Sequence, residues 1–355
     1  MRRDLAYITA LLSLAFVTAC NTTTSKEGPE IYENYIFFGQ QFPTKAPLVT
    51  QATDIDKFGV IGFKYDYATT WEEYKTKSEC TPNLFFGDDN APVNIETLDC
   101  TSGTPTYTPL QGWSNTKKYT FFAFYPIDNA NVKLISTEGG EYLGGTPAIE
   151  YSLNTADPKS SMVDLMAAAP QTDKYYLSAT ENNLNGSNEV KFTFDHLLSS
   201  IGVKLTKATA NTVIINNISL KISGIKYRQY SVPLDGSDKT PKGPALDKTT
   251  LILSLPETGV EVSGESEGSE ISDKLIFIPQ SENVTINLTL NYTRSDATGA
   301  SYTTDNITLG AVTTPLTAGQ KHLVHLKFTD STVEIESKVT EGAWNDIPDV
   351  ENTFN

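Results

Sequence analysis

The stretch NVTINLTLNYT, residues 283–293, alternates apolar and polar side chains without a break. The apolar positions are Val284, Ile286, Leu288, Leu290 and Tyr292, and threonine or asparagine stands between them. Successive side chains of a β-strand point to opposite faces of a sheet, so this pattern predicts a strand with one buried and one solvated face. Such half-buried strands are typical of antiparallel sheets.

Other segments share this density of β-branched and aromatic residues. They are KYTFFAFYP (118–126), EVKFTF (189–194), TVIINNISLKI (212–222), TTLILSL (249–255), DKLIFIPQ (273–280) and KHLVHLKF (321–328). Helical patterns are scarce, and WEEYKTK (71–77) predicts at most one helical turn. Many short strands separated by glycine, asparagine, aspartate and proline predict an all-β chain of antiparallel β-sandwiches.

The length of the chain indicates two domains, because 355 residues exceed the ~150 residues of a common domain. The polar stretch SATENNLNGSNE, residues 178–189, is rich in asparagine, glycine and serine and reads as a linker. We therefore expect an N-terminal sandwich over residues 46–180 and a C-terminal sandwich over residues 186–355.

The first twenty residues have the three-part pattern of a secretory signal. Arg2 and Arg3 precede an uncharged apolar run over residues 7–19. That run is shorter than the ~20 residues that span a bilayer, which predicts a signal peptide over residues 1–19. Cys20 resembles the lipidated cysteine of the bacterial lipobox; the alternative is ordinary cleavage beside an incidental cysteine. Lipidation of Cys20 with palmitate-like acyl chains would anchor an otherwise water-soluble chain to the outer membrane.

Charge limits the partners of the chain. It carries 43 acidic and 27 basic side chains and a formal net charge of −16 at pH 7. Such a surface repels nucleic acids and anionic lipid headgroups. We therefore expect no nucleic-acid partner, and membrane attachment only through the N-terminal lipid.

The two remaining cysteines, Cys80 and Cys100, fall within the first predicted domain. An oxidising periplasm or cell surface permits a disulfide between them. The alternative is a pair of free, buried thiols. We favour the disulfide.

Catalytic patterns are absent from the sequence. His322 and His325 are three residues apart on a predicted strand, so they face opposite sides and cannot chelate one metal together. His196 reads as a packing or capping residue. No zinc-protease, nucleophile-elbow or P-loop motif occurs. We therefore expect no enzyme, metal or cofactor, although the abundant carboxylates leave a hydrolase with an unrecognised acid pair as a minor alternative.

Several segments, in chain order, resemble the fimbrillin family, the subunits of type V pili of Gram-negative bacteria. They are TKAPLVTQATDIDKFGVIGFKY (44–65), KYTFFAFYP (118–126), DLMAAAP (164–170), VKFTFDHLLSSIGVKL (190–205), IFIPQ (276–280) and LTAGQKHLVHLKF (316–328). The resemblance implies two transthyretin-like antiparallel β-sandwich domains. It also implies export through the periplasm as a lipoprotein to the outer membrane and the fimbrium.

The resemblance further implies that a protease removes an N-terminal strand and so opens a groove for a strand of a neighbouring subunit. Residues 20–45 would then be a propeptide, in which EIYENYIFFGQQF (30–42) forms the strand. In the family the cut follows an arginine. Here Lys45 stands at the matching place, and Ala46 would begin the mature chain.

The C-terminal residues 331–355 are the candidate donor strand for that groove. Their apolar members are Val333, Ile335, Val339 and Trp344. An alternating strand at a chain end suits insertion beside a neighbour's sheet. The alternative is that this segment is the last strand of its own domain, and the sequence leaves the two open.

The leading interpretation is a shaft, tip or accessory subunit of type V fimbriae that contributes to adhesion. Its partners would be other fimbrial subunits and a receptor on a host or bacterial surface. The alternative is a surface lipoprotein that binds glycan or another ligand without polymerising. Exposed aromatic residues would favour that alternative, and Trp71 and Trp113 are candidates if they do not pack in the core.

Overall fold

The computed structural model describes the chain in segments that together form most of both predicted halves. The described residues are 35–41, 55–80, 86–88, 91–93, 95–135, 145–154, 158–176, 189–236, 241, 245–255, 259–262, 264, 269–270, 275–304 and 307–336. Nearly all regular structure in them is strand, which confirms the all-β class. Two helices of four residues each occur there, α2 (Trp71–Tyr74) and α3 (Pro158–Ser161), and α2 is the predicted helical turn.

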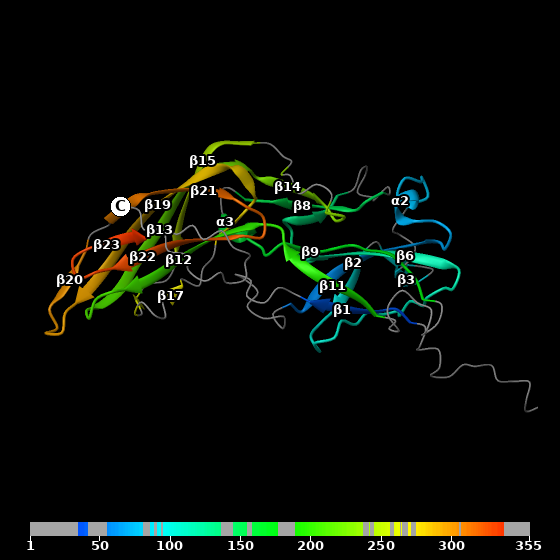
Figure 1. The fold of residues 1–355 in the computed structure, drawn as a ribbon, viewed down its shortest axis with the longest axis horizontal. Helices are drawn as coiled ribbons and strands as arrows, with labels where there is room; N and C mark the ends of the chain where they lie inside the picture. Colours follow the sequence, from blue (N-terminus) through cyan, green and yellow to red (C-terminus); the bar gives the residue numbers. More distant parts are fainter. Residues whose placement is uncertain are drawn as a thin grey trace, which may run out of the picture.

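A seven-stranded sheet forms one end of the molecule (Figure 1). Its strand order is β1 (Phe37–Gln41), β11 (Glu189–His196), β9 (Met166–Ala168), β6 (Lys117–Tyr125), β2 (Lys57–Asp66) and β5 (Glu96–Asp99), with β10 (Gln171–Lys174) paired to β6. Neighbouring strands run antiparallel, except that β1 is parallel to β11. The sheet therefore ends on a strand taken from the N-terminal part of the chain.

Two sheets form the opposite end of the molecule (Figure 1). One has the order β17 (Ser269–Glu270), β12 (Ser199–Lys207), β22 (Lys321–Phe328) and β23 (Val333–Glu336), with β18 (Leu275–Phe277) also paired to β12. The other has the order β15 (Ala245–Leu255), β13 (Thr212–Tyr227), β19 (Gln280–Ser295) and β20 (Ser301–Thr303), with β16 (Val260–Glu261) on β13 and β21 (Ile307–Leu316) on β19. The rings of Tyr292 and Phe328 meet edge to face at 5.1 Å, so the two sheets pack against each other.

The strand predicted from residues 283–293 lies within β19, and its apolar side chains are all buried. A face of alternating Val, Ile and Leu can leave water only against a second apolar surface. The sheet that contains β12 and β22 supplies that surface. The period-two pattern was thus sufficient to identify the buried face.

The predicted domain boundary at residues 180–186 assigns two strands to the wrong half of the molecule. The segment β11 was expected to open the C-terminal sandwich, yet it lies between β1 and β9 in the seven-stranded sheet. Likewise β14 (Gln229–Pro233) pairs with β8 (Ala148–Ser152), and β8 pairs with β7 (Val132–Leu134). The physical reason is aromatic packing: Phe192 and Phe194 of β11 contact Phe58 of β2, a contact that linker composition does not encode. A further pair, β3 (Phe86–Asp88) and β4 (Ala91–Val93), forms a short hairpin.

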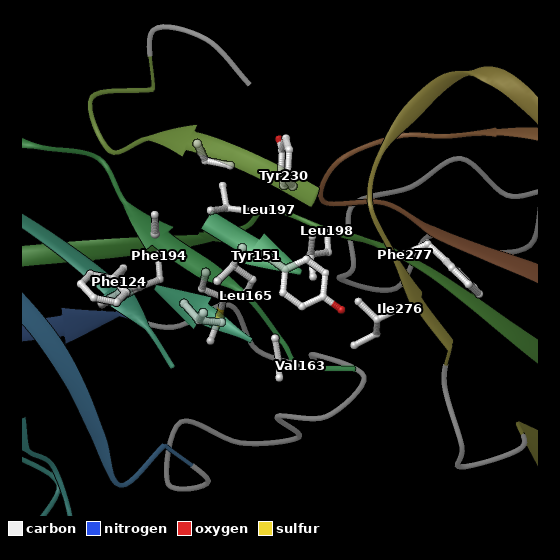
Figure 2. Packing of buried hydrophobic residues seen from close by; sticks show 14 of the residues in the cluster. Phe124, Tyr151, Val163, Leu165, Phe194, Leu197, Leu198, Tyr230, Ile276 and Phe277 are labelled. Atoms are coloured by element: carbon white, nitrogen blue, oxygen red, sulfur yellow. The ribbon is translucent and has the colours of Figure 1, made fainter. Parts of the chain in front are cut away.

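The two ends are joined by a continuous hydrophobic core rather than by a polar hinge (Figure 2). Leu197 and Leu198 connect β11 directly to β12 and are both buried. In Figure 2 they lie near Tyr151 and Leu165, with Ile276 and Phe277 of the opposite end beyond them. The amide of Leu197 donates to the carbonyl of Leu165 at 2.9 Å, which fixes the start of this connection.

No helix in the described part of the chain has the length and apolar character needed to cross a membrane.

Candidate functional site

The edge strand β1 is buried on one side and exposed on the other. Ile36 and Phe38 have 0% and 1% of their surface exposed, whereas Phe37 between them has 37% exposed. This is the period-two arrangement of a strand that covers a core. The strand expected over residues 30–42 is therefore present in the described part of that segment, at Phe37–Gln41.

Backbone contacts hold β1 at the edge of the seven-stranded sheet. Its residues pair in parallel register with β11, from Phe37 opposite Glu189 to Gln41 opposite Thr193. Just before the strand, the amide of Ile36 donates to the carbonyl of Gln111 at 2.9 Å. β11 is its only strand partner in the described sheet, so β1 closes an edge that would otherwise present unpaired backbone groups.

Aromatic rings form the floor beneath β1. The ring of Phe38 stacks on Phe192 at 5.7 Å and meets Phe121 edge to face at 5.2 Å. It also contacts Tyr107 at 5.5 Å. Each such aromatic pair contributes about 0.5–1.5 kcal/mol beyond simple burial. We call Tyr107, Phe121 and Phe192 the β1 seat, because they are the rings that Phe38 covers.

Tyr107 also binds the backbone of the strand. Its hydroxyl donates to the carbonyl of Ile36 at 2.9 Å and accepts from the amide of Gln111 at 3.2 Å. Burial raises the pKa of Tyr107 to about 12, so the hydroxyl remains protonated and able to donate. Nearby on β5, burial raises the pKa of Glu96 to about 7. Sequence reasoning missed Tyr107, which stands in an irregular segment without a strand pattern.

At the opposite end of the molecule, β23 is also an edge strand. Its residues pair antiparallel with β22, from Phe328 opposite Val333 to His325 opposite Glu336. Val333 and Ile335 are only half-buried against the core. In this structure residues 333–336 therefore form the last strand of their own sheet, which was the alternative to the donor strand.

The other residues singled out for processing and assembly lie outside the described part of the chain. They are Cys20, Lys45, Ala46, Val339 and Trp344. Lipidation at Cys20 and cleavage between Lys45 and Ala46 stay predictions.

The predicted disulfide between Cys80 and Cys100 is absent, and both are free, buried thiols. The amide of Cys100 donates to the carbonyl of Asp56 at 2.7 Å, beside the start of β2. Cys80 lies near Tyr74, whose ring stacks on Tyr65 near the far end of β2. The two cysteines therefore lie beside opposite ends of β2, whereas a disulfide needs Cα atoms within about 7 Å. Neither the spacing of the two cysteines in the sequence nor an oxidising compartment indicates this separation.

The comparison with known protein families shows to which family the chain belongs. A family described as fimbrillin-like matches residues 44–344. The chain belongs to the fimbrillin-like family. The match covers most of the chain but begins after β1, which therefore lies outside it.

Solved structures similar to this chain include two proteins from Bacteroides. A fimbrial protein from Bacteroides vulgatus is 21% identical, with a TM-score of 0.59 over 88% of this chain and 100% of that one. A candidate cell adhesion protein from Bacteroides ovatus is 15% identical, with a TM-score of 0.48 over 89% of this chain and 99% of that one. At such identities the first similarity supports the fold alone. No curated protein matches the chain significantly.

The histidines of this fimbrillin-like chain are bound within the fold. His322 and His325 lie on opposite faces of β22, as their spacing predicted; His325 Nε2 pairs with the Thr206 hydroxyl at 2.8 Å. His196 Nδ1 lies 2.6 Å from a carboxylate oxygen of Asp164. Within the described ranges, no group of three or more histidine, cysteine, aspartate or glutamate residues is arranged to hold a metal ion.

The two tryptophans considered as ligand platforms are core residues. Trp71 packs on Phe63 at 4.8 Å, and Trp113 meets Tyr119 edge to face at 5.0 Å. Both are buried. Neither offers an exposed face for stacking a sugar, so these two residues give no support to the alternative of a glycan-binding lipoprotein.

Proposed function

We propose that this chain is a structural subunit of fimbriae, exported as a lipoprotein and assembled by β-strand addition. The observation that carries the proposal is the β1 edge: a terminal strand that covers aromatic rings and closes a sheet edge. An open sheet edge above apolar side chains is a binding site for a strand of another chain, in which backbone bonds give affinity and side-chain pockets give register.

Release of β1 would create that acceptor. Cleavage after Lys45 would separate residues 20–45, which include β1, from the rest of the chain. The β1 seat and the outer edge of β11 would then face solvent. The family match begins at residue 44, next to the proposed cut after Lys45. Acylation of Cys20 would hold the precursor at the outer membrane until this cut.

The donor would come from the C-terminal residues 331–355 of a neighbouring subunit. Val333 and Ile335 have the same two-residue spacing as the buried Ile36 and Phe38. They are half-buried in their own sheet, so β23 has less apolar contact to lose than β1. For donation, either β23 must detach from β22, or the residues that follow β23 must enter the neighbour's groove without it. The partners are accordingly other fimbrial subunits, with adhesion to a host or bacterial surface as the biological result.

Limited proteolysis of the precursor tests this proposal. Brief digestion with a lysine-specific protease should give a stable fragment that begins at Ala46, and that fragment should then form a ladder of oligomers. Lys45→Gln is the matched variant, because cleavage at Lys26 alone leaves β1 in place. The variant should remain monomeric under the same digestion. A cut fragment that stays monomeric, or filaments made of uncut precursor, would exclude this mechanism.

A further inference from the structure

A cavity of about 330 Å³ lies beside the β19–β20 hairpin. This hairpin is at the end of the molecule remote from β1 (Figure 1). It is bordered by the hairpin and by the turn that precedes β23. Its volume is at the lower end of the range for small-molecule sites, about 300–1,000 Å³. None of its lining residues belongs to the β1 edge.

An exposed aromatic ring stands at this cavity. Tyr302 of β20 has 66% of its surface exposed, the largest value among the exposed large apolar side chains of the described residues. It pairs directly with Arg294 of β19, so the two side chains lie on one face of the hairpin. An exposed ring on a short edge strand contributes little to the core and presents a flat apolar face to solvent.

The polar groups around the ring are fixed by the fold before any ligand binds. Arg294 donates to the backbone carbonyls of Asp330 and Thr332, and its guanidinium lies 5.7 Å from the centre of the Tyr292 ring. Asp296 Oδ1 accepts from the amide and hydroxyl of Thr298 at 2.9 and 2.6 Å. Held in this way, the side chains lose little conformational entropy on binding.

Both carboxylates of the cavity can accept hydrogen bonds. The contacts from Thr298 keep the pKa of Asp296 below its usual range, so it is ionised at neutral pH. Asp330 Oδ1 accepts from the hydroxyl of Thr209, and its Oδ2 has no hydrogen bond from the described residues. Ionised carboxylates are acceptors only, and they bind ligands that bring several hydroxyl donors.

We propose that this cavity binds a neutral saccharide. The apolar face of a sugar ring would stack on Tyr302, while its hydroxyls donate to Asp330 and Asp296. Two carboxylates beside a single arginine, whose terminal nitrogens already bind backbone carbonyls, disfavour sialylated or sulfated glycans by charge repulsion. Saccharide binding at this cavity does not depend on strand addition, because a non-polymerising chain would carry the same cavity.

Glycan-array binding with the full chain tests the site. Neutral oligosaccharides should bind, and Tyr302→Ala should weaken the best of them at least tenfold in calorimetry. Tyr302→Phe should stay within about threefold, because it keeps the ring. Tyr67→Ala is the matched control, since Tyr67 is also exposed but lies in the seven-stranded-sheet half, beside Tyr175. Asp330→Asn should weaken binding with an unchanged unfolding midpoint.

Each of the following binding results would overturn the proposed saccharide site. Absence of any neutral glycan signal excludes the proposal. Equal binding by Tyr302→Ala and the parent chain, or equal losses for Tyr302→Ala and Tyr67→Ala, also excludes it. Binding confined to sialylated or sulfated glycans would contradict the electrostatic argument and overturn the assignment to neutral saccharides.

Discussion

Two edge strands, β1 and β23, close sheets at opposite ends of this fimbrillin-like chain, and they are attached in different ways. β1 covers three aromatic rings with a fully buried Phe38, whereas β23 contributes the half-buried Val333 and Ile335. β1 pairs with a strand about 150 positions later in the chain. β23 follows its partner through a short turn, in which the amide of Thr329 donates to the carbonyl of Thr332 at 2.9 Å.

The difference is the basis of the roles proposed above for the two edges. Loss of β1 leaves a large apolar surface without cover, because the strand covers three aromatic rings. The contacts of β1 are non-local, and no described hairpin tethers the strand to its sheet. Loss of β23 uncovers less apolar surface and is opposed by its turn. In the proposed assembly, the acceptor site needs the large apolar surface that loss of β1 uncovers, and the donor strand needs the small loss of apolar contact shown by β23. Burial therefore distinguishes two edge strands that have the same secondary structure.

Replacement of Phe38 should have the largest effect. Phe38→Ala removes a fully buried ring and should lower the free energy of unfolding by about 3–5 kcal/mol. Phe37→Ala, at the adjacent exposed position, should cost less than about 1 kcal/mol. Urea unfolding of the precursor measures both. Similar losses for the two variants would mean that β1 is not seated through Phe38.

The two ends should also respond to pH in opposite directions. Burial raises the pKa of Glu96 to about 7, so its stabilising contribution is present below its ordinary pKa of 4.5 and is lost as the pH rises to 7. Burial lowers the pKa of His322 to about 4, so its contribution is present above 6.5 and is lost as the pH falls toward 4. Each effect should amount to about 1–3 kcal/mol.

Urea unfolding at pH 5 and pH 7 resolves these contributions. Glu96→Gln should make stability rise more steeply with pH than in the parent chain, and His322→Gln should make it rise less. If neither variant changes the difference between the two pH values, both side chains have ordinary pKa values in the folded chain.

Ile335→Ala should have the smallest effect, on the order of 1 kcal/mol, because the side chain is half-buried in an edge strand. The same variant should slow oligomer formation by the cut protein if Ile335 enters the β1 seat of a neighbour. Unfolding and oligomerisation assays on one preparation separate the two effects. A loss comparable with that of Phe38→Ala would place β23 firmly in its own core and weaken its assignment as a donor.

Local patterns predicted the strands and their buried faces but not their partners. Residues 283–293 and 321–328 carry a period of two, and that period fixes which side chains face the core. The placement of β11 beside β1 depends on Phe192 meeting Phe38, a contact between residues far apart in sequence. Tyr107 and the separation of Cys80 from Cys100 were missed for the same reason, since each is set by tertiary packing.

Peptide binding to the cut and uncut protein tests the central claim most directly. A labelled peptide of residues 331–345 should bind the fragment that begins at Ala46 and should not bind the intact precursor, in which β1 occupies the seat. An unlabelled peptide of residues 30–44, which contains β1, should displace it and serves as the positive control for an open seat. If the 30–44 peptide rebinds while the 331–345 peptide binds neither form, or binds both equally, the C-terminal segment is not the donor for the β1 seat.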